Sequence, residues 1–289
     1  MDKCTNISAT ADTILDISKT QFLSNKVNKQ RFVSFLINHL QNIIGNILCV
    51  QAPDDADVLI ITTALECLQT TDVTIYGDDT DLMALLVHHA DTIQASNYNM
   101  ILQTKVCRWD IKTLLDKIHG TTFKSHILAI HALSGCDTSS RIYGKGKEKF
   151  FNIHRDNVEY WNAAELFYKI DVPKEEIIKA GQLIFLTVYR NANQNVIGDL
   201  NSLRAACYEG KTYKAASLIK AQTLPPTSDA AALHSLRCYL QVQVWQGNDT
   251  LNPLENRVWV WYQEWIYAPN YDECICSSGL SVGQYQLWL

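Results

Sequence analysis

The sequence predicts an α/β protein, with a mainly parallel sheet flanked by helices and a helical C-terminal half. Three observations lead to this fold class. Before about Phe151, short β-branched segments alternate with segments of helical periodicity, which is typical of layered domains with parallel strands. Beyond Phe151 the strand signal fades while the helical patterns continue. No internal repeat at solenoid spacing interrupts this plan.

The first elements follow from hydrophobic spacing. Apolar residues over 32–47 recur at helical intervals and predict an amphipathic helix, with Asn28 as its N-cap. The short apolar piece 47–50 is a candidate strand. A second helix is expected over 54–68, opened by Pro53.

The next elements alternate between strand and helix. The segment 72–76 is short, β-branched and followed by a glycine, so we expect a buried strand there. A helix follows through 82–87, and 99–106 indicates one or two further strands. Asp110 is expected to cap a helix that ends at Gly120.

The second half is expected to be helical, with helices over 157–169, 174–190, 199–208 and 229–246. The residues from 249 on contain several tryptophans but no clear period. We therefore expect three regions: an α/β domain over 1–152 that ends in a helix–hairpin–helix segment at about 124–152, a helical extension over 153–248, and a Trp-rich irregular tail over 249–289.

Composition excludes several protein classes. Among the 289 residues, 47% are hydrophobic and 19% are charged, which is the balance of a folded protein. No apolar stretch approaches the ~18 residues that span a bilayer. The N-terminus lacks the basic start and apolar core of a secretory signal, and the nine cysteines show no repeating spacing. We therefore expect no membrane partner and an intracellular protein, nuclear or cytoplasmic, that is not secreted.

Acidic residues gather at the ends of expected elements. Carboxylates at the carboxyl ends of strands repel one another unless a divalent cation lies between them, and Mg²⁺ or Mn²⁺ favours such oxygen ligands. Two such ions about 4 Å apart can promote phosphodiester cleavage. For either acidic group taken alone, helix capping is the better explanation. Capping does not, however, require that two or three acids occur within four positions in two separate groups. The acids in question are Asp54, Asp55, Asp57, Asp78, Asp79, Asp81 and Asp137.

A basic segment follows Asp137. The net charge of −5 argues mildly against binding nucleic acid through overall charge, yet 141–155 contains five Lys or Arg and one Glu. Its Gly-Lys-Gly-Lys core at 144–147 predicts a hairpin whose backbone N–H groups could receive a phosphate. A solvated basic turn is the alternative explanation.

Four motifs in order resemble the flap endonuclease/XPG branch of PIN-like nucleases over roughly 50–152. They are PDDAD (53–57), GDDTDL (77–82), LSGCD (133–137) and IYGKGK (142–147). The resemblance implies a PIN-like fold with a helix–two-turn–helix at about 124–152. It also implies a Mg²⁺- or Mn²⁺-dependent, structure-selective nuclease that acts on DNA in preference to RNA.

The resemblance assigns roles residue by residue. It makes Asp55 and Asp57 the first acidic pair, Asp79 and Asp81 the second pair, and Asp137 the last acid; all five are catalytic and metal-binding candidates. The nucleic-acid-binding candidates are Arg141, Gly144, Lys145, Gly146, Lys147 and Lys149, with the two glycines as backbone donors to a phosphate.

The chain departs from the family in two places. The family has further acids upstream of the first pair, including one at the end of its first strand. Here Asp16 is a poor substitute, so the chain resembles an N-terminally shortened, mobile-element-derived member. The family's usual Ile between the hairpin glycines is Lys145, which removes an apolar anchor and adds charge.

Two other functions stay open. The incomplete acid set favours a catalytically inactive module that binds nucleic acid or protein. A phosphotransfer or phosphohydrolase domain with a strand-end Asp as nucleophile is the other alternative.

Other side chains are weaker candidates. Adjacent His88 and His89 point about 100° apart on a helix and are expected to pack or face solvent. Cys274 and Cys276 supply two of the four ligands of a structural zinc, and Cys136 has no evident His partner. The tail tryptophans are expected to pack against the helical half.

Overall fold

The computed structural model describes residues 6–7, 10, 13–52, 56–118, 123–155, 157–190, 198–213 and 218–248, and the backbone of 260–262 and 265–267. The chain divides into two units after Leu59. This division falls inside α3 (Asp57–Cys67), which is one continuous helix and is described with the second unit.

The first unit contains α1 (Lys19–Ser24) and α2 (Lys26–Ile43). Asn25 caps α2, because its side chain accepts from the amides of Val27 and Asn28. The expectation that Asn28 is the cap is therefore wrong. Asn28 lies inside the helix and is fully buried, and its Oδ1 accepts from Ile7 N at 2.7 Å.

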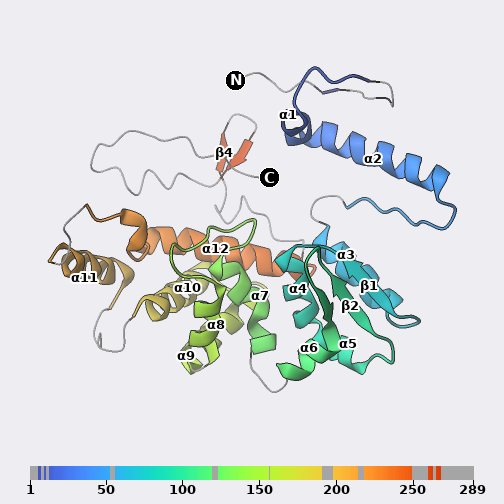
Figure 1. Cartoon of the computed structure of the whole chain (residues 1–289). Coiled ribbons are helices and arrows are strands. Elements are labelled where there is room, and N and C mark those ends of the chain that lie inside the picture. Colours follow the sequence, from blue (N-terminus) through green and yellow to red (C-terminus); the bar gives the residue numbers. More distant parts are fainter. Residues whose placement is uncertain are drawn as a thin grey trace. The chain divides into compact units, whose positions relative to one another are not determined.

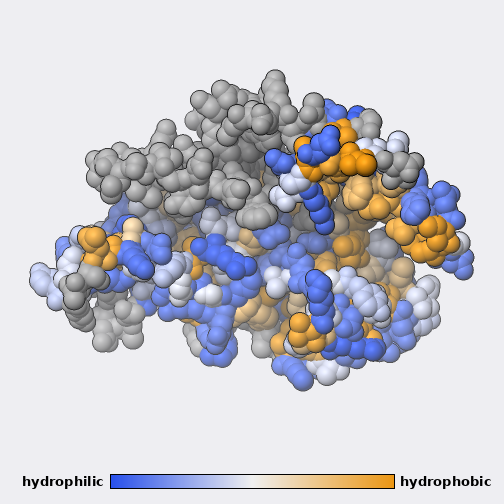
Figure 2. Space-filling view, turned by 45° about the horizontal axis from the view of Figure 1, so that its top comes forward, coloured by the Kyte–Doolittle hydropathy of each residue, from blue (hydrophilic) through white to orange (hydrophobic). Residues whose placement is uncertain are grey.

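The expected strand over 47–50 is also wrong, since the segment has no regular structure. Leu48 and Val50 are 82% and 60% exposed, and none of the described strands pairs with this segment. A strand needs a neighbour for its backbone hydrogen bonds, so apolar residues alone do not produce one. Phe32, Leu36 and Leu40 of α2 are each more than a third exposed. Figure 2 shows that hydrophobic side chains gather in several places on one face of the molecule.

The second unit begins with an α/β layer (Figure 1), whose sheet is mixed rather than mainly parallel. Strand β1 pairs in parallel with β2, and β2 pairs antiparallel with β3. A four-residue turn connects β2 to β3, closed by Thr104 N donating to Cys107 O at 2.8 Å, and so short a connection produces an antiparallel pair. The elements are α3, β1 (Val73–Tyr76), α4 (Thr80–His88), α5 (Ala90–Ala95), β2 (Met100–Gln103), β3 (Arg108–Asp110) and α6 (Ile111–Lys117).

Local signals in this layer are largely confirmed. The strand expected over 72–76 is β1, and the segment 99–106 contains β2. Asp110 caps α6, because its side chain accepts from Thr113 N at 2.9 Å. The expected end of this helix at Gly120 lies outside the described residues.

Between Phe123 and Trp245 the described elements are all helical, as expected. The four helices expected beyond Phe151 are present as α9, α10, α11 and α12, and buried residues recur along α12 from Ala230 to Trp245. The elements are α7 (Phe123–Ser134), α8 (Lys147–Arg155), α9 (Val158–Glu165), η1 (Leu166–Tyr168), α10 (Lys174–Tyr189), α11 (Leu200–Thr212), η2 (Ala221–Thr223) and α12 (Ser228–Trp245).

Helices α10 and α12 approach closely because of a glycine. A Cβ placed on Gly181 would lie 1.8 Å from Ser235 Oγ and 2.5 Å from Ser235 Cβ. Since the side chain of α12 fills this space, the contact requires glycine on α10.

The tail is not wholly irregular. Strands β4 (Val260–Tyr262) and β5 (Trp265–Tyr267) pair antiparallel, with Val260 opposite Tyr267. Cys274, Cys276 and Trp288 lie outside the described residues. Among the helices that the structure describes, none is both long and apolar enough to cross a bilayer.

Candidate functional site

The turn between β1 and α4 carries two of the predicted acids. Asp79 is the N-cap of α4, and its Oδ1 accepts from Asp81 N at 3.0 Å. Asp79 therefore caps a helix, which is the simpler explanation for an acid at this position. Asp81 lies in the first turn of α4 and is only 5% exposed, although a carboxylate is seldom buried without partners.

Asp57 joins these two acids from the first turn of α3. Each of Asp57, Asp79 and Asp81 offers an oxygen, and the three oxygens lie within 4.8 Å of one another. We call these three residues the acidic triad. Its members come from two helix starts, and they range from exposed Asp79 through half-buried Asp57 to buried Asp81.

The other predicted acids are placed differently. Asp55 lies outside the described residues. Asp137 is exposed on the loop after α7 and is not a member of the acidic triad. Asp78 forms a surface ion pair with Lys105, whose Nζ lies 2.6 Å from Asp78 Oδ2, and this hydrogen bond lowers the pKa of the Asp78 carboxyl.

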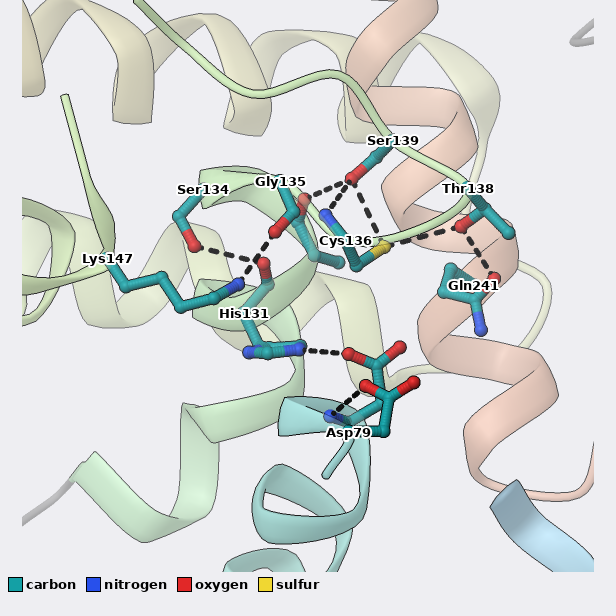
Figure 3. Close-up of polar contacts among 11 residues, drawn as sticks. Asp79, His131, Ser134, Gly135, Cys136, Thr138, Ser139, Lys147 and Gln241 are labelled. Atoms are coloured by element: carbon teal, nitrogen blue, oxygen red, sulfur yellow. Dashed lines mark hydrogen bonds and ion pairs between the residues drawn. The ribbon is translucent and has the colours of Figure 1, made fainter. Parts of the chain in front are cut away.

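A buried histidine contacts the triad. His131 Nε2 lies 2.6 Å from Asp81 Oδ1, and the two side chains are 3% and 7% exposed. Figure 3 shows His131 next to Asp79 of the triad. Because an ionised carboxylate only accepts, the imidazole donates from Nε2. Sequence reasoning missed His131, since it is 50 residues from Asp81 and lies in an apolar helical run. In the sequence, the one signal for this residue was that a histidine interrupts the otherwise apolar run 127–133.

The loop that follows α7 is held by specific hydrogen bonds. Gly135 has a φ of 110°, and a Cβ there would lie 2.8 Å from Arg141 Cα. Ser139 Oγ accepts from Cys136 N and donates to Ala132 O. Thr138 Oγ1 donates to Gln241 on α12 at 2.7 Å, so the loop is attached to two helices (Figure 3).

Lys147 of the basic segment packs against the loop that follows α7. It is half-buried, and its Nζ donates to Gly135 O at 2.6 Å (Figure 3). Burial and the like charge of Arg141 lower the pKa of the Lys147 ammonium, while the carboxylates of Asp81 and Asp79 oppose that shift. The ammonium therefore lies within electrostatic range of two triad carboxylates.

The other predicted nucleic-acid-binding residues lie on the surface or are half-buried. Arg141, Gly144 and Gly146 are exposed, and Gly144 adopts a φ of 66°. Lys145 Nζ lies 5.0 Å from the ring centre of Tyr189, a cation–π contact. Burial, together with the like charge of half-buried Lys149, lowers the pKa of Lys145.

Two further histidine groups are not part of the acidic triad. The rings of His88 and His89 lie 5.0 Å apart, and burial lowers the pKa of His88 to about 4. His126 Nδ1 lies 2.9 Å from His154 Nε2, and His126 Nε2 lies 2.9 Å from Glu165 Oε2. Sequence spacing did not indicate this second group, which joins α7, α8 and α9.

Similarity to known proteins assigns this chain neither a family nor a function. The chain matches no family model, no curated protein and no solved structure.

Proposed function

We propose that the chain is a divalent-metal-dependent, structure-selective nuclease that cleaves phosphodiester bonds in DNA, with Asp57, Asp79 and Asp81 as the cation ligands. The observation that carries the proposal is the convergence of these three carboxylates within 4.8 Å. The motifs that resemble the flap endonuclease/XPG branch place acids at the same two helix starts.

The donor set suits a hard divalent cation. All three triad groups are carboxylates, which are the ligands that Mg²⁺ and Mn²⁺ favour. Three negative charges so close together are unfavourable without a counter-charge, and burial of Asp81 strengthens their repulsion. The repulsion would be relieved by a cation that all three contact.

The protein's own groups would serve the substrate. The Lys147 ammonium would attract a phosphate toward the triad, because it carries positive charge near the carboxylates. Exposed Arg141 and the hairpin at 144–146 would hold the backbone of a duplex without reading its sequence. A bound cation would supply Lewis-acid activation of the phosphodiester.

The test is cleavage of flap and hairpin DNA by the purified full chain in Mg²⁺. Asp79→Asn and Asp81→Asn are each expected to lower the cleavage rate at least ~100-fold, because a neutral amide binds the cation poorly. Asp110→Asn is the matched control, since Asp110 also caps a helix but lies outside the triad. Equal cleavage by all three variants would contradict the proposal.

A second function is a catalytically inactive module that binds nucleic acid. The contact between His131 and Asp81 favours it, because a hydrogen bond from His131 Nε2 satisfies one oxygen of the buried Asp81 carboxylate without a cation. This function predicts binding of the same DNA in EDTA, with no cleavage in either Mg²⁺ or Mn²⁺. Binding that is lost in Lys147→Met but retained in Asp79→Asn would support it.

A further inference from the structure

We infer that His131 is a positioning residue for the triad: its hydrogen bond orients the Asp81 carboxylate so that one oxygen is left for a divalent cation. The inference rests on the proposed function, because it concerns the same cation site. It adds a residue that neither the acidic motifs nor the basic hairpin includes.

The geometry of the pair carries the inference. Asp81 Oδ1 accepts from His131 Nε2 at 2.6 Å, which is short for an N–H···O contact and typical of a charge-assisted bond. His131 on α7 thus engages Oδ1 of Asp81. This hydrogen bond leaves Oδ2 of the same carboxylate available for a cation. A carboxylate with one oxygen held in this way has less freedom to rotate.

The surroundings restrict the imidazole as well. His131 is 3% exposed, and its ring lies 5.6 Å from the Trp245 ring on α12. The same α7 turn is fixed by Ser134 Oγ, which donates to His131 O at 3.0 Å (Figure 3). Because both the ring and its backbone are held, His131 can hold Asp81 in one orientation.

A positioning residue acts on cation affinity through the ligand it contacts. Loss of such an outer contact in metal sites typically lowers metal affinity 10–100-fold. A merely structural histidine would lower the stability of the chain without changing the affinity of the folded protein for the ion. Cation affinity therefore separates the two roles, and it requires no substrate.

The experiment titrates the full chain with Mn²⁺ alone and follows the free ion by electron paramagnetic resonance. His131→Phe keeps a ring but removes the donor, and it is expected to weaken Mn²⁺ binding ~10-fold or more. His131→Gln returns an N–H at similar reach and is expected to bind within ~3-fold of wild type. His126→Phe is the matched control, because His126 is a buried histidine of α7 that contacts Glu165 instead of the triad.

The outcomes distinguish this inference from the proposed function. If wild type and Asp110→Asn bind Mn²⁺ and Asp81→Asn does not, the cation site of the proposed function is supported. If His131→Phe then binds Mn²⁺ like wild type, His131 has no positioning role. If wild type itself binds no Mn²⁺, both fail. Circular dichroism checks folding. Should His131→Phe not fold, His131→Asn replaces it: its shorter reach is expected to weaken binding relative to His131→Gln, and equal affinities would overturn the inference.

Discussion

Buried His234 is expected to make the protein less stable in mild acid. Its side chain is 1% exposed on α12, and Nε2 lies 3.1 Å from Leu133 O on α7. Burial lowers the pKa of His234 from 6.5 to about 4, and the neighbouring Arg237 charge acts in the same direction. The folded chain therefore keeps this histidine neutral at pH values where the unfolded chain protonates it.

The sign and size of the effect follow from proton linkage. Between pH 6.5 and pH 4 the unfolded state binds more protons, so the free energy of unfolding falls as the pH falls. For one group with these two pKa values, the loss between pH 7.5 and pH 5 is about 2 kcal/mol. His154, which is fully buried and also has a pKa lowered to about 4, adds a loss in the same direction.

The assay is urea unfolding of wild type and His234→Gln at pH 7.5 and pH 5. The glutamine amide can still donate to Leu133 O but does not titrate in this range, so the variant is expected to lose about 2 kcal/mol less than wild type. His39→Gln, at an exposed position of α2, is the control. If wild type and His234→Gln lose the same free energy of unfolding, burial does not suppress protonation of His234 in the folded chain.

Three further outcomes follow from local contacts. Gly181→Ala should lower the free energy of unfolding by about 1–3 kcal/mol, because its Cβ would overlap Ser235; in urea unfolding the same change should cost clearly less in a Ser235→Gly background, where the overlapping side chain is absent. Asp110→Ala should cost about 1 kcal/mol through loss of the α6 cap, against almost no change for Asp110→Asn. Lys147→Met should weaken binding of duplex DNA, measured by fluorescence anisotropy, and affinity equal to wild type would exclude Lys147 from the interface.

Elements with strong local signals were predictable. Helix α10 follows from its apolar pattern over 16 residues, and the start of α12 follows from its capping residue Thr227. The cap at Asp110 depends on a contact only three residues away. The mistaken N-cap shows the limit of this reasoning. Asn25 and Asn28 are both suitable caps, and the choice depends on the distant amide of Ile7, which Asn28 binds instead.

The sheet was less predictable because strand pairing is not local. The segment 47–50 has the composition of a strand but pairs with none of the described strands, whereas β3 is short and exposed yet pairs with β2. The direction of β3 depends on the turn after Gln103 rather than on the strand residues themselves. A mainly parallel sheet was therefore the wrong expectation even though β1 and β2 are parallel.

By itself the sequence determined which acids begin helices, because a capping carboxylate bonds an amide within two or three residues of its own position. Tertiary structure alone decided that the acids of α3 and α4 converge, that Asp81 is buried, and that His131 donates to it. The physical reason is that packing of α4 against α7 joins groups 50 residues apart, and no local pattern in the chain encodes which polar group meets which partner across that contact.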